Sequence, residues 1–214
     1  MNTESENKSS NLLIGCTGSI ASKLLLEIIK ASRLLNFNIK IVLTNSAKIF
    51  TDKEELDYTH LKNSYNCDIF TDNDEWQYYN KFKRVLHIEL RDWANYLLIA
   101  PLSANTLAKI YNGICDNLLT CIIKAWCNNK QIFYAPAMNT KMYNHYLTEI
   151  HRNYLNKVLG YIEIVSESKK LACGDIGIGA MAHINKIFKE INNYVNRKKI
   201  TDYFKKVPLA KKKD

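Results

Sequence analysis

Three residues in separate parts of the chain carry side chains that could take part in catalysis. His87 lies within the apolar stretch 85–88, and a histidine can transfer protons when its pKa is close to the working pH. Asn139 lies in a turn that follows an apolar, aromatic run and Pro136. Cys173 lies in a polar, glycine-rich segment, where a thiol is more accessible than in a core. His87 could also be a hydrogen-bonded core residue, and Asn139 could be an ordinary turn residue.

Two strand ends near the N-terminus could hold an anion. Residues 11–16 are typical of an apolar strand, and residues 17–19 (Thr-Gly-Ser) lead from it into a helical pattern. Residues 38–43 predict a second strand, and residues 44–46 after it all carry hydrogen-bonding side chains. Since a helix N-terminus offers free N–H groups and a favourable dipole, one phosphate could lie between the two turns. The first turn has a single glycine and no G-x-G-x-x-G pattern, so an ordinary tight turn is the alternative.

Two later strand ends repeat one arrangement of residues. The strand predicted at 96–100 ends at Pro101 and is followed by Ser-Ala-Asn-Thr at 103–106. The strand predicted at 131–134 also ends at an Ala-Pro pair, and the turn with Asn139 follows. In open α/β sheets, ligands bind at the carboxyl ends of the strands. The repeated arrangement therefore indicates a ligand site at one edge of the sheet.

Strand and helix patterns alternate five or six times along the chain. This alternation predicts an α/β fold with a single doubly wound, mostly parallel sheet of the three-layer Rossmann type. Residues 50–82 are harder to interpret, because they contain one strand-like piece and could be an insertion at the sheet edge. The remaining pattern predicts a helix over 140–155, a last strand over 161–165, a mobile flap over 166–180 and a closing helix over 181–196.

Composition restricts the class of protein. The chain has 214 residues, of which 47% are hydrophobic, and this length suits one sizeable core. No apolar run is long enough for a membrane span, and no secretion signal is recognisable. The six cysteines form no C-x-x-C pair and no histidine lies at metal-ligand spacing. We therefore expect no metal site, reduced thiols and a cytoplasmic location, with the nucleus as a further compartment.

Most of the net charge of +9 lies at the C-terminal end. Residues 197–214 hold eight basic and two acidic side chains, so the rest of the chain carries only about +3. A body with so little net charge is not expected to bind nucleic acid. We expect a disordered N-terminus at 1–10, one domain at 11–196 and a solvated basic tail at 197–214.

Four motifs occur in one order along the chain. They are His87 opening His-Ile-Glu-Leu-Arg, Ser-Ala-Asn-Thr at 103–106, Pro-x-Met-Asn-x-x-Met at 136–142 and Ala-Cys-Gly-Asp at 172–175. On these motifs the chain resembles the homo-oligomeric flavin-containing cysteine decarboxylases. The resemblance is strongest to the eukaryotic members that act on 4′-phosphopantothenoylcysteine in coenzyme A biosynthesis. Residues 11–196 would then be a flavoprotein domain.

The resemblance implies a flavodoxin-like fold, bound FMN and a homotrimer with the active site between subunits. It implies FMN-dependent decarboxylation to 4′-phosphopantetheine, by flavin oxidation to a thioaldehyde, loss of CO2 and re-reduction. His87 would be the catalytic base and Cys173 the acid, and the substrate would bind to Asn139, Met142 and Ala172. The positions that the resemblance implies for FMN are Gly18, Ser19, Ile20, Thr44, Asn45, Ser46, Ser103, Ala104, Asn105, Thr106 and Ala137.

Two positions depart from the family pattern. Asp92 stands where relatives often carry a second arginine, and this loss of positive charge could weaken binding of the substrate's phosphate or carboxylate. Tyr143 stands where tryptophan is usual and keeps an aromatic surface. Two other functions remain open: a phosphatase-inhibitory regulatory subunit of the same fold, and a related flavoprotein acting on another cysteine-containing or prenyl substrate.

Overall fold

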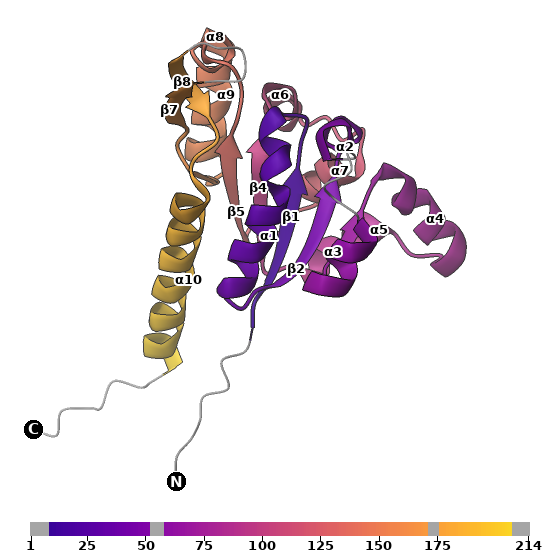
Figure 1. Ribbon diagram of the computed structural model, residues 1–214. Coiled ribbons are helices and arrows are strands. Elements are labelled where there is room, and N and C mark those ends of the chain that lie inside the picture. The colour runs from indigo at the N-terminus through magenta and orange to yellow at the C-terminus, as the bar shows by residue number, and fades with distance from the viewer. Residues whose placement is uncertain (1–8, 52–57, 171–175, 207–214) are drawn as a thin grey trace, which may run out of the picture.

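A six-stranded parallel sheet forms the centre of the protein. The computed structural model describes residues 9–51, 58–170 and 176–206. The strand order is β3-β2-β1-β4-β5-β6, so it reverses between β1 and β4 (Figure 1). This order confirms the predicted doubly wound sheet and is that of the Rossmann type. The strands are β1 (Asn11–Cys16), β2 (Asn38–Leu43), β3 (Asp68–Phe70), β4 (Tyr96–Leu102), β5 (Gln131–Pro136) and β6 (Ile162–Glu163).

The inner strands are buried on both faces. All seven residues of β4 are buried, which explains its unbroken apolar sequence. Leu12 and Ile14 of β1 pack into the core on one face of the sheet, and Leu13 packs into the core on the other. Each of these fully buried side chains contributes roughly 1.5–3 kcal/mol relative to exposure. The alternation therefore attaches a layer of helices to each face.

Helices cover both faces of the sheet. One layer contains α1 (Leu25–Leu34) and α10 (Ile184–Lys206), which contact each other. The other layer contains α5 (Leu86–Trp93), α6 (Ala104–Asn112), α7 (Leu118–Lys124) and α9 (Tyr146–Lys157). The short elements η1 (Ile20–Leu24), α2 (Asn45–Thr51) and α8 (Thr140–Tyr143) each follow a strand of the sheet. Helices α3 (Tyr58–Tyr65) and α4 (Asp72–Phe82) flank β3, and α4 projects from the body (Figure 1).

Several predicted elements have different bounds in the structure. Strand β4 continues past Pro101 to Leu102, because the pairing with β5 shifts register between Ile99 and Leu102 and so tolerates the proline. The helix predicted over 140–155 is divided into α8 and α9, since His145 caps α9 by accepting a hydrogen bond from the Leu147 N–H (3.2 Å). The closing helix begins at Ile184 and extends past residue 196 to Lys206.

The segment predicted as a mobile flap is partly regular. Strands β7 (Glu167–Lys170) and β8 (Ile176–Ala180) form an antiparallel pair that is separate from the main sheet. The predicted last strand over 161–165 is reduced to the two residues of β6 that pair with β5. Within the described part of the chain, no helix has both the length and the apolar character needed to cross a membrane.

Candidate active site

A polar pocket of about 220 Å³ lies where the strand order reverses. Its lining combines residues from the loops after β1, β2 and β4 with residues from α4, from α6 and from the segment before α7. Seven of the predicted cofactor residues line it: Gly18, Thr44, Asn45, Ser46, Ser103, Asn105 and Thr106. The sequence prediction that these strand ends meet at one edge is therefore confirmed. We call this pocket the cradle.

Three helix starts surround the cradle. Ser19 caps η1, with its Oγ accepting a hydrogen bond from the Ala21 N–H (3.4 Å). Thr44 precedes α2 and accepts from the Ala47 N–H (3.2 Å), and Ser103 caps α6 by accepting from the Thr106 N–H (3.3 Å). The first N–H groups of a helix have no partner within it, and its dipole is positive at that end. The cradle is therefore suited to an anion such as a phosphate.

The loops that form the cradle are in close contact. A Cβ atom on Gly18 would lie 2.5 Å from the Cβ of Ser46, so only glycine allows the first two loops to approach this closely. The hydroxyl of Thr17, which is fully buried, donates to the carbonyl of Pro101 (2.8 Å) and accepts from the Ser103 N–H (2.8 Å). These contacts join the loop after β1 to the loops after β2 and β4.

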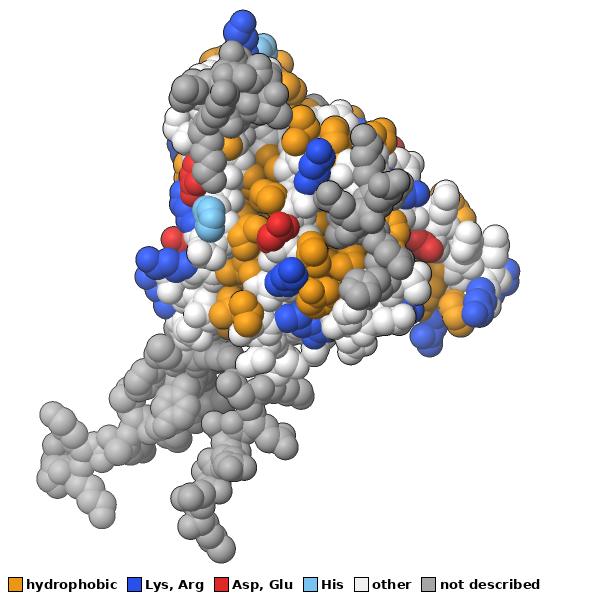
Figure 2. All heavy atoms as spheres, in the orientation of Figure 1, with side chains coloured by type: hydrophobic (Ala, Val, Ile, Leu, Met, Phe, Trp, Pro, Cys, Tyr) orange, Lys and Arg blue, Asp and Glu red, His pale blue; other side chains and the backbone are white. Residues whose placement is uncertain are grey.

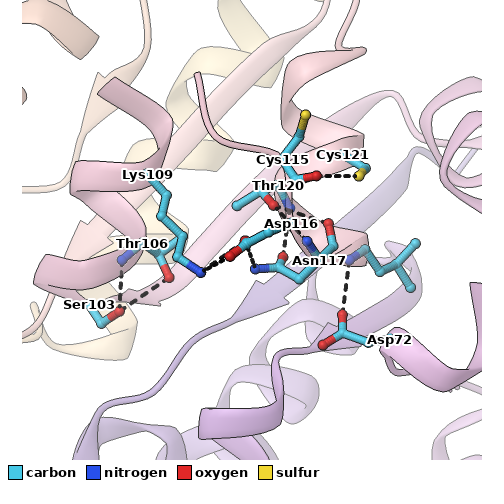
Figure 3. Close-up of polar contacts among 10 residues, drawn as sticks. Asp72, Ser103, Thr106, Lys109, Cys115, Asp116, Asn117, Thr120 and Cys121 are labelled. Atoms are coloured by element: carbon cyan, nitrogen blue, oxygen red, sulfur yellow. Dashed lines mark hydrogen bonds and ion pairs between the residues drawn. The ribbon is translucent and has the colours of Figure 1, made fainter. Parts of the chain in front are cut away.

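Charged residues that the sequence analysis missed form one wall of the cradle. Lys109 forms an ion pair with Asp116 (2.6 Å), and the Asn117 amide donates to the same carboxylate (3.1 Å; Figure 3). The hydrogen bond from Lys109 holds the pKa of the Asp116 carboxyl below its usual range. Asp72, the first residue of α4, accepts from the Leu118 N–H (2.9 Å) and so connects α4 to α7. Because Lys109 neutralises Asp116, that carboxylate repels a bound anion less.

Four predicted cofactor residues lie outside this lining. Ser19 and Ile20 form the start of η1, and Ala104 is the first residue of α6. Ala137 is buried directly after β5, and its N–H donates to the carbonyl of Leu102 (2.9 Å). All four lie at the same carboxyl edge of the sheet as the cradle.

His87 is held by a carboxylate from another helix. Its Nδ1 lies 2.8 Å from Oε1 of Glu75, and its backbone N–H donates to Oε2 of the same side chain (3.0 Å). The side chains of His87 and Glu75 are 25% and 16% exposed, respectively. His87 is therefore a hydrogen-bonded residue, as the structural alternative predicted, but its ring is not fully buried. Glu75 lies in the part of the sequence that was hardest to interpret.

Asn139 lies at a junction between a strand and a helix, as predicted. It is exposed, and it caps α8 by accepting a hydrogen bond from the Met142 N–H (2.8 Å). The side chain of Met142 is also exposed (48%). Strand β8 packs against this turn, where the Met138 N–H donates to the carbonyl of Gly179 (2.9 Å). The predicted substrate residue Ala172 and the predicted acid Cys173 lie outside the described residues.

Within one chain, His87 and Asn139 lie beside different elements and do not form a common site. His87 lies on α5, beside α4 and α7, whereas Asn139 lies beside β8 and α9. Figure 1 shows α5 and α8 at opposite sides of the sheet. The cradle lies between them, because it is formed at the β1–β4 pair in the middle of the strand order. Among the described residues, no group of three His, Cys, Asp or Glu side chains could hold a metal ion.

The sequence of this chain is similar to those of known flavoproteins. A family model described as Flavoprotein matches residues 1–196. The chain is 43% identical over 189 residues to phosphopantothenoylcysteine decarboxylase of Mus musculus, covering 87% of this chain and 88% of the mouse protein. It is 44% identical over 197 residues to a probable phosphopantothenoylcysteine decarboxylase of Arabidopsis thaliana, covering 89% and 91% of the two chains.

Solved structures show the same similarity. A cysteine-to-serine mutant of PPC decarboxylase, complexed with pantothenoylaminoethenethiol, is 42% identical and superposes with a TM-score of 0.81. That match covers 88% of this chain and 100% of the solved chain. The FMN-binding protein AtHal3 is also 42% identical, with a TM-score of 0.76 and coverage of 87% and 97%.

Proposed function

This chain belongs to the flavoprotein family, and on that premise we propose that it is an FMN-dependent decarboxylase. It converts 4′-phosphopantothenoylcysteine to 4′-phosphopantetheine and CO2, a step of coenzyme A biosynthesis. The observation that carries this proposal is the 43–44% identity to decarboxylases of that substrate along nearly their whole length. The cradle at the carboxyl edge of the sheet supports it, because its lining combines helix starts that suit a phosphate with polar side chains that suit a hydroxylated chain.

The cradle fits the phosphate and ribityl chain of FMN. The phosphate would lie at the helix starts near Ser19 and Ser46, where Gly18 leaves no Cβ in the way. Asn105, Asn117 and the paired Asp116 offer acceptors and donors for the ribityl hydroxyls. FMN held there would supply a two-electron acceptor for oxidation of the substrate's cysteine moiety and a donor for the later reduction.

We propose that the chain's own residues position the substrate and transfer its protons. His87 would take the thiol proton as the hydride leaves Cβ, and this step gives a thioaldehyde. With its carboxylate held at Asn139, the thioaldehyde would lose CO2, and the electrons of the broken bond would form an enethiolate. Cys173 would then donate a proton to Cα of the enethiolate. Return of the hydride to Cβ, and of a proton from His87 to the sulfur, would complete the product.

We further propose that the enzyme is a homotrimer with active sites between subunits. The placement of His87 on α5 and Asn139 at the start of α8 supports this arrangement, because a site that uses both residues would combine those of two neighbouring chains. Exposed apolar side chains also support it. Helix α4 has no buried residue and exposes Trp76, Tyr79 and Phe82 (49–71%), and Figure 2 shows hydrophobic side chains on the face that carries η1 and α1.

A change on α4 tests the assembly. Trp76→Asp is expected to lower the molar mass measured by light scattering from that of a trimer towards that of a monomer. Asp68→Ala, on the exposed Lys62–Asp68 pair, serves as a control. An unchanged mass for Trp76→Asp would mean that this helix is not part of the interface. The cytoplasmic location inferred from the sequence stays a prediction, and fractionation of cells would test it.

The activity is tested with purified protein and its substrate. We expect a yellow protein that releases FMN on denaturation and forms CO2 and 4′-phosphopantetheine in equal amounts. His87→Asn should lower kcat at least about 100-fold while FMN is retained, since a positioned base contributes about 10²–10⁴. His151→Asn, at a histidine stacked on Tyr111, is the control. A yellow protein that releases no CO2, or full activity in His87→Asn, would refute the proposal.

A further inference from the structure

We propose that Glu75 is a positioning residue that fixes the tautomer and orientation of His87. The inference rests on the proposed function, because it assigns His87 the role of base. It concerns a residue that touches the imidazole and not the substrate. The two oxygens of the Glu75 carboxylate bind two groups of His87, the ring Nδ1 at 2.8 Å and the backbone N–H at 3.0 Å.

This pairing fixes which ring nitrogen is free. A carboxylate only accepts hydrogen bonds, so the Nδ1 that faces it carries the proton. Nε2 is then left with a lone pair, and within the described residues it has no hydrogen-bond partner. The same hydrogen bond fixes the orientation of the ring, because the imidazole cannot turn without losing it. Glu75 therefore selects the tautomer and the orientation that a base needs.

Glu75 is itself fixed in place by polar contacts of α4. Thr71 and Asp74 form a capping box at the start of this helix. Asp72 accepts a hydrogen bond from the Leu118 N–H and connects α4 to α7. Tyr78 of α4 also packs against the core cluster that includes Leu86 and Leu90 of α5, so apolar and polar contacts together position α4. The partial burial of Glu75, at 16% exposure, strengthens its hydrogen bonds compared with those of a surface carboxylate.

A purely structural role for Glu75 makes different predictions. The bond to the backbone N–H of His87 lies in the first turn of α5, where an acceptor stabilises the helix. If this were its whole role, loss of Glu75 would reduce stability and leave kcat unchanged. A positioning role predicts that kcat falls, that KM and FMN content stay close to wild type, and that the loss depends on His87.

The test is a double-mutant cycle on the full-length flavoprotein, read by decarboxylation. Glu75→Ala is expected to lower kcat roughly 10- to 100-fold, a part of what a positioned base supplies. In a His87→Asn background, the same change should alter the residual rate by less than about twofold. Glu75→Gln keeps an oxygen that accepts from Nδ1 but removes the charge, so its kcat should lie between those of wild type and Glu75→Ala. Glu190→Ala, on the exposed surface of α10, is the control for loss of an acidic side chain.

Nitrogen-15 NMR of the histidine rings gives a readout that does not depend on activity. The His87 signals are those missing from the His87→Asn spectrum. In wild type, Nδ1 should carry the proton and Nε2 should have the shift of an unprotonated nitrogen, and Glu75→Ala should show both tautomers. The proposal is overturned by a wild-type ring protonated at Nε2 only, by wild-type kcat in Glu75→Ala, or by equal losses in both backgrounds.

The two proposals fail in distinguishable ways. If wild type forms no CO2, the proposed function fails, while the NMR spectra still decide the state of His87. If Glu75→Ala does not fold, Glu75→Gln and the wild-type spectrum decide the inference.

Discussion

Adding one methyl group at Gly18 should weaken FMN binding. The Cβ atom of Gly18→Ala would lie 2.5 Å from the Cβ of Ser46, well inside the contact distance of two carbon atoms. The loops after β1 and β2 must therefore move apart, and overpacking of this kind costs about 1–3 kcal/mol. If the free protein relaxes and the bound protein cannot, the cost appears in the affinity. It corresponds to a rise in Kd of about 5- to 150-fold.

Fluorescence titration of the apoprotein with FMN measures this change directly. Thermal unfolding of the apoprotein, measured in parallel, shows how much of the strain is already present without FMN. The matched variant is Gly18→Ala/Ser46→Gly, in which the clashing Cβ of Ser46 is removed. Its Kd should be close to that of Ser46→Gly alone, which reports the loss of the Ser46 hydroxyl.

Two results would refute this reasoning. Wild-type affinity in Gly18→Ala would mean that the loops do not need their close approach to bind FMN. If the fold-increase in Kd of the double variant equals the product of the fold-increases of the two single variants, the two positions act independently.

Two further predictions concern buried groups. Arg152→Leu should lower the free energy of unfolding in urea by about 3–5 kcal/mol, because it leaves Glu163, 6% exposed, without its partner at 2.7 Å. Lys62→Leu, at an exposed ion pair, should cost less than about 1 kcal/mol, and equal losses would contradict the role of burial. Burial raises the pKa of the Cys16 thiol to about 12, so iodoacetamide at pH 8 should label exposed Cys115 long before Cys16, as mass spectrometry would show. Equal labelling rates for the two thiols would contradict the burial of Cys16. Because the Cys16 thiol ionises at a higher pH in the folded protein than in the unfolded chain, it lowers the free energy of unfolding as pH rises from about 9 towards 12.

The sheet and the cradle loops could be predicted because their signals are local. Apolar runs such as that of β4 are continuous in the sequence, and parallel strands place their carboxyl ends at one edge. Ser103 and Asn105 could therefore be grouped with Ser46 without knowing any contact between them. Asn139 could be located at a helix start from its neighbours alone.

The wall of the cradle and the partner of His87 could not be predicted in the same way. Asp72 and Glu75 come from α4, an exposed helix without the apolar periodicity that marks a core element. The Lys109–Asp116 pair depends on how α6 and the following loop fold back on each other, which no spacing rule specifies. The break between α8 and α9 depends on a histidine acting as a cap, a role usually taken by smaller side chains.

His87 and Asn139 lie on different sides of the cradle within one chain. In the proposed ring of three identical chains, this separation determines how mutations in different chains combine. Each chain would lend its imidazole to one neighbour and its amide to the other. A chain lacking one of the two residues would therefore inactivate one of the two sites to which it contributes, whereas a chain lacking both would inactivate both. Conversely, two chains that are inactive alone, one lacking His87 and the other lacking Asn139, would restore part of the activity when co-expressed.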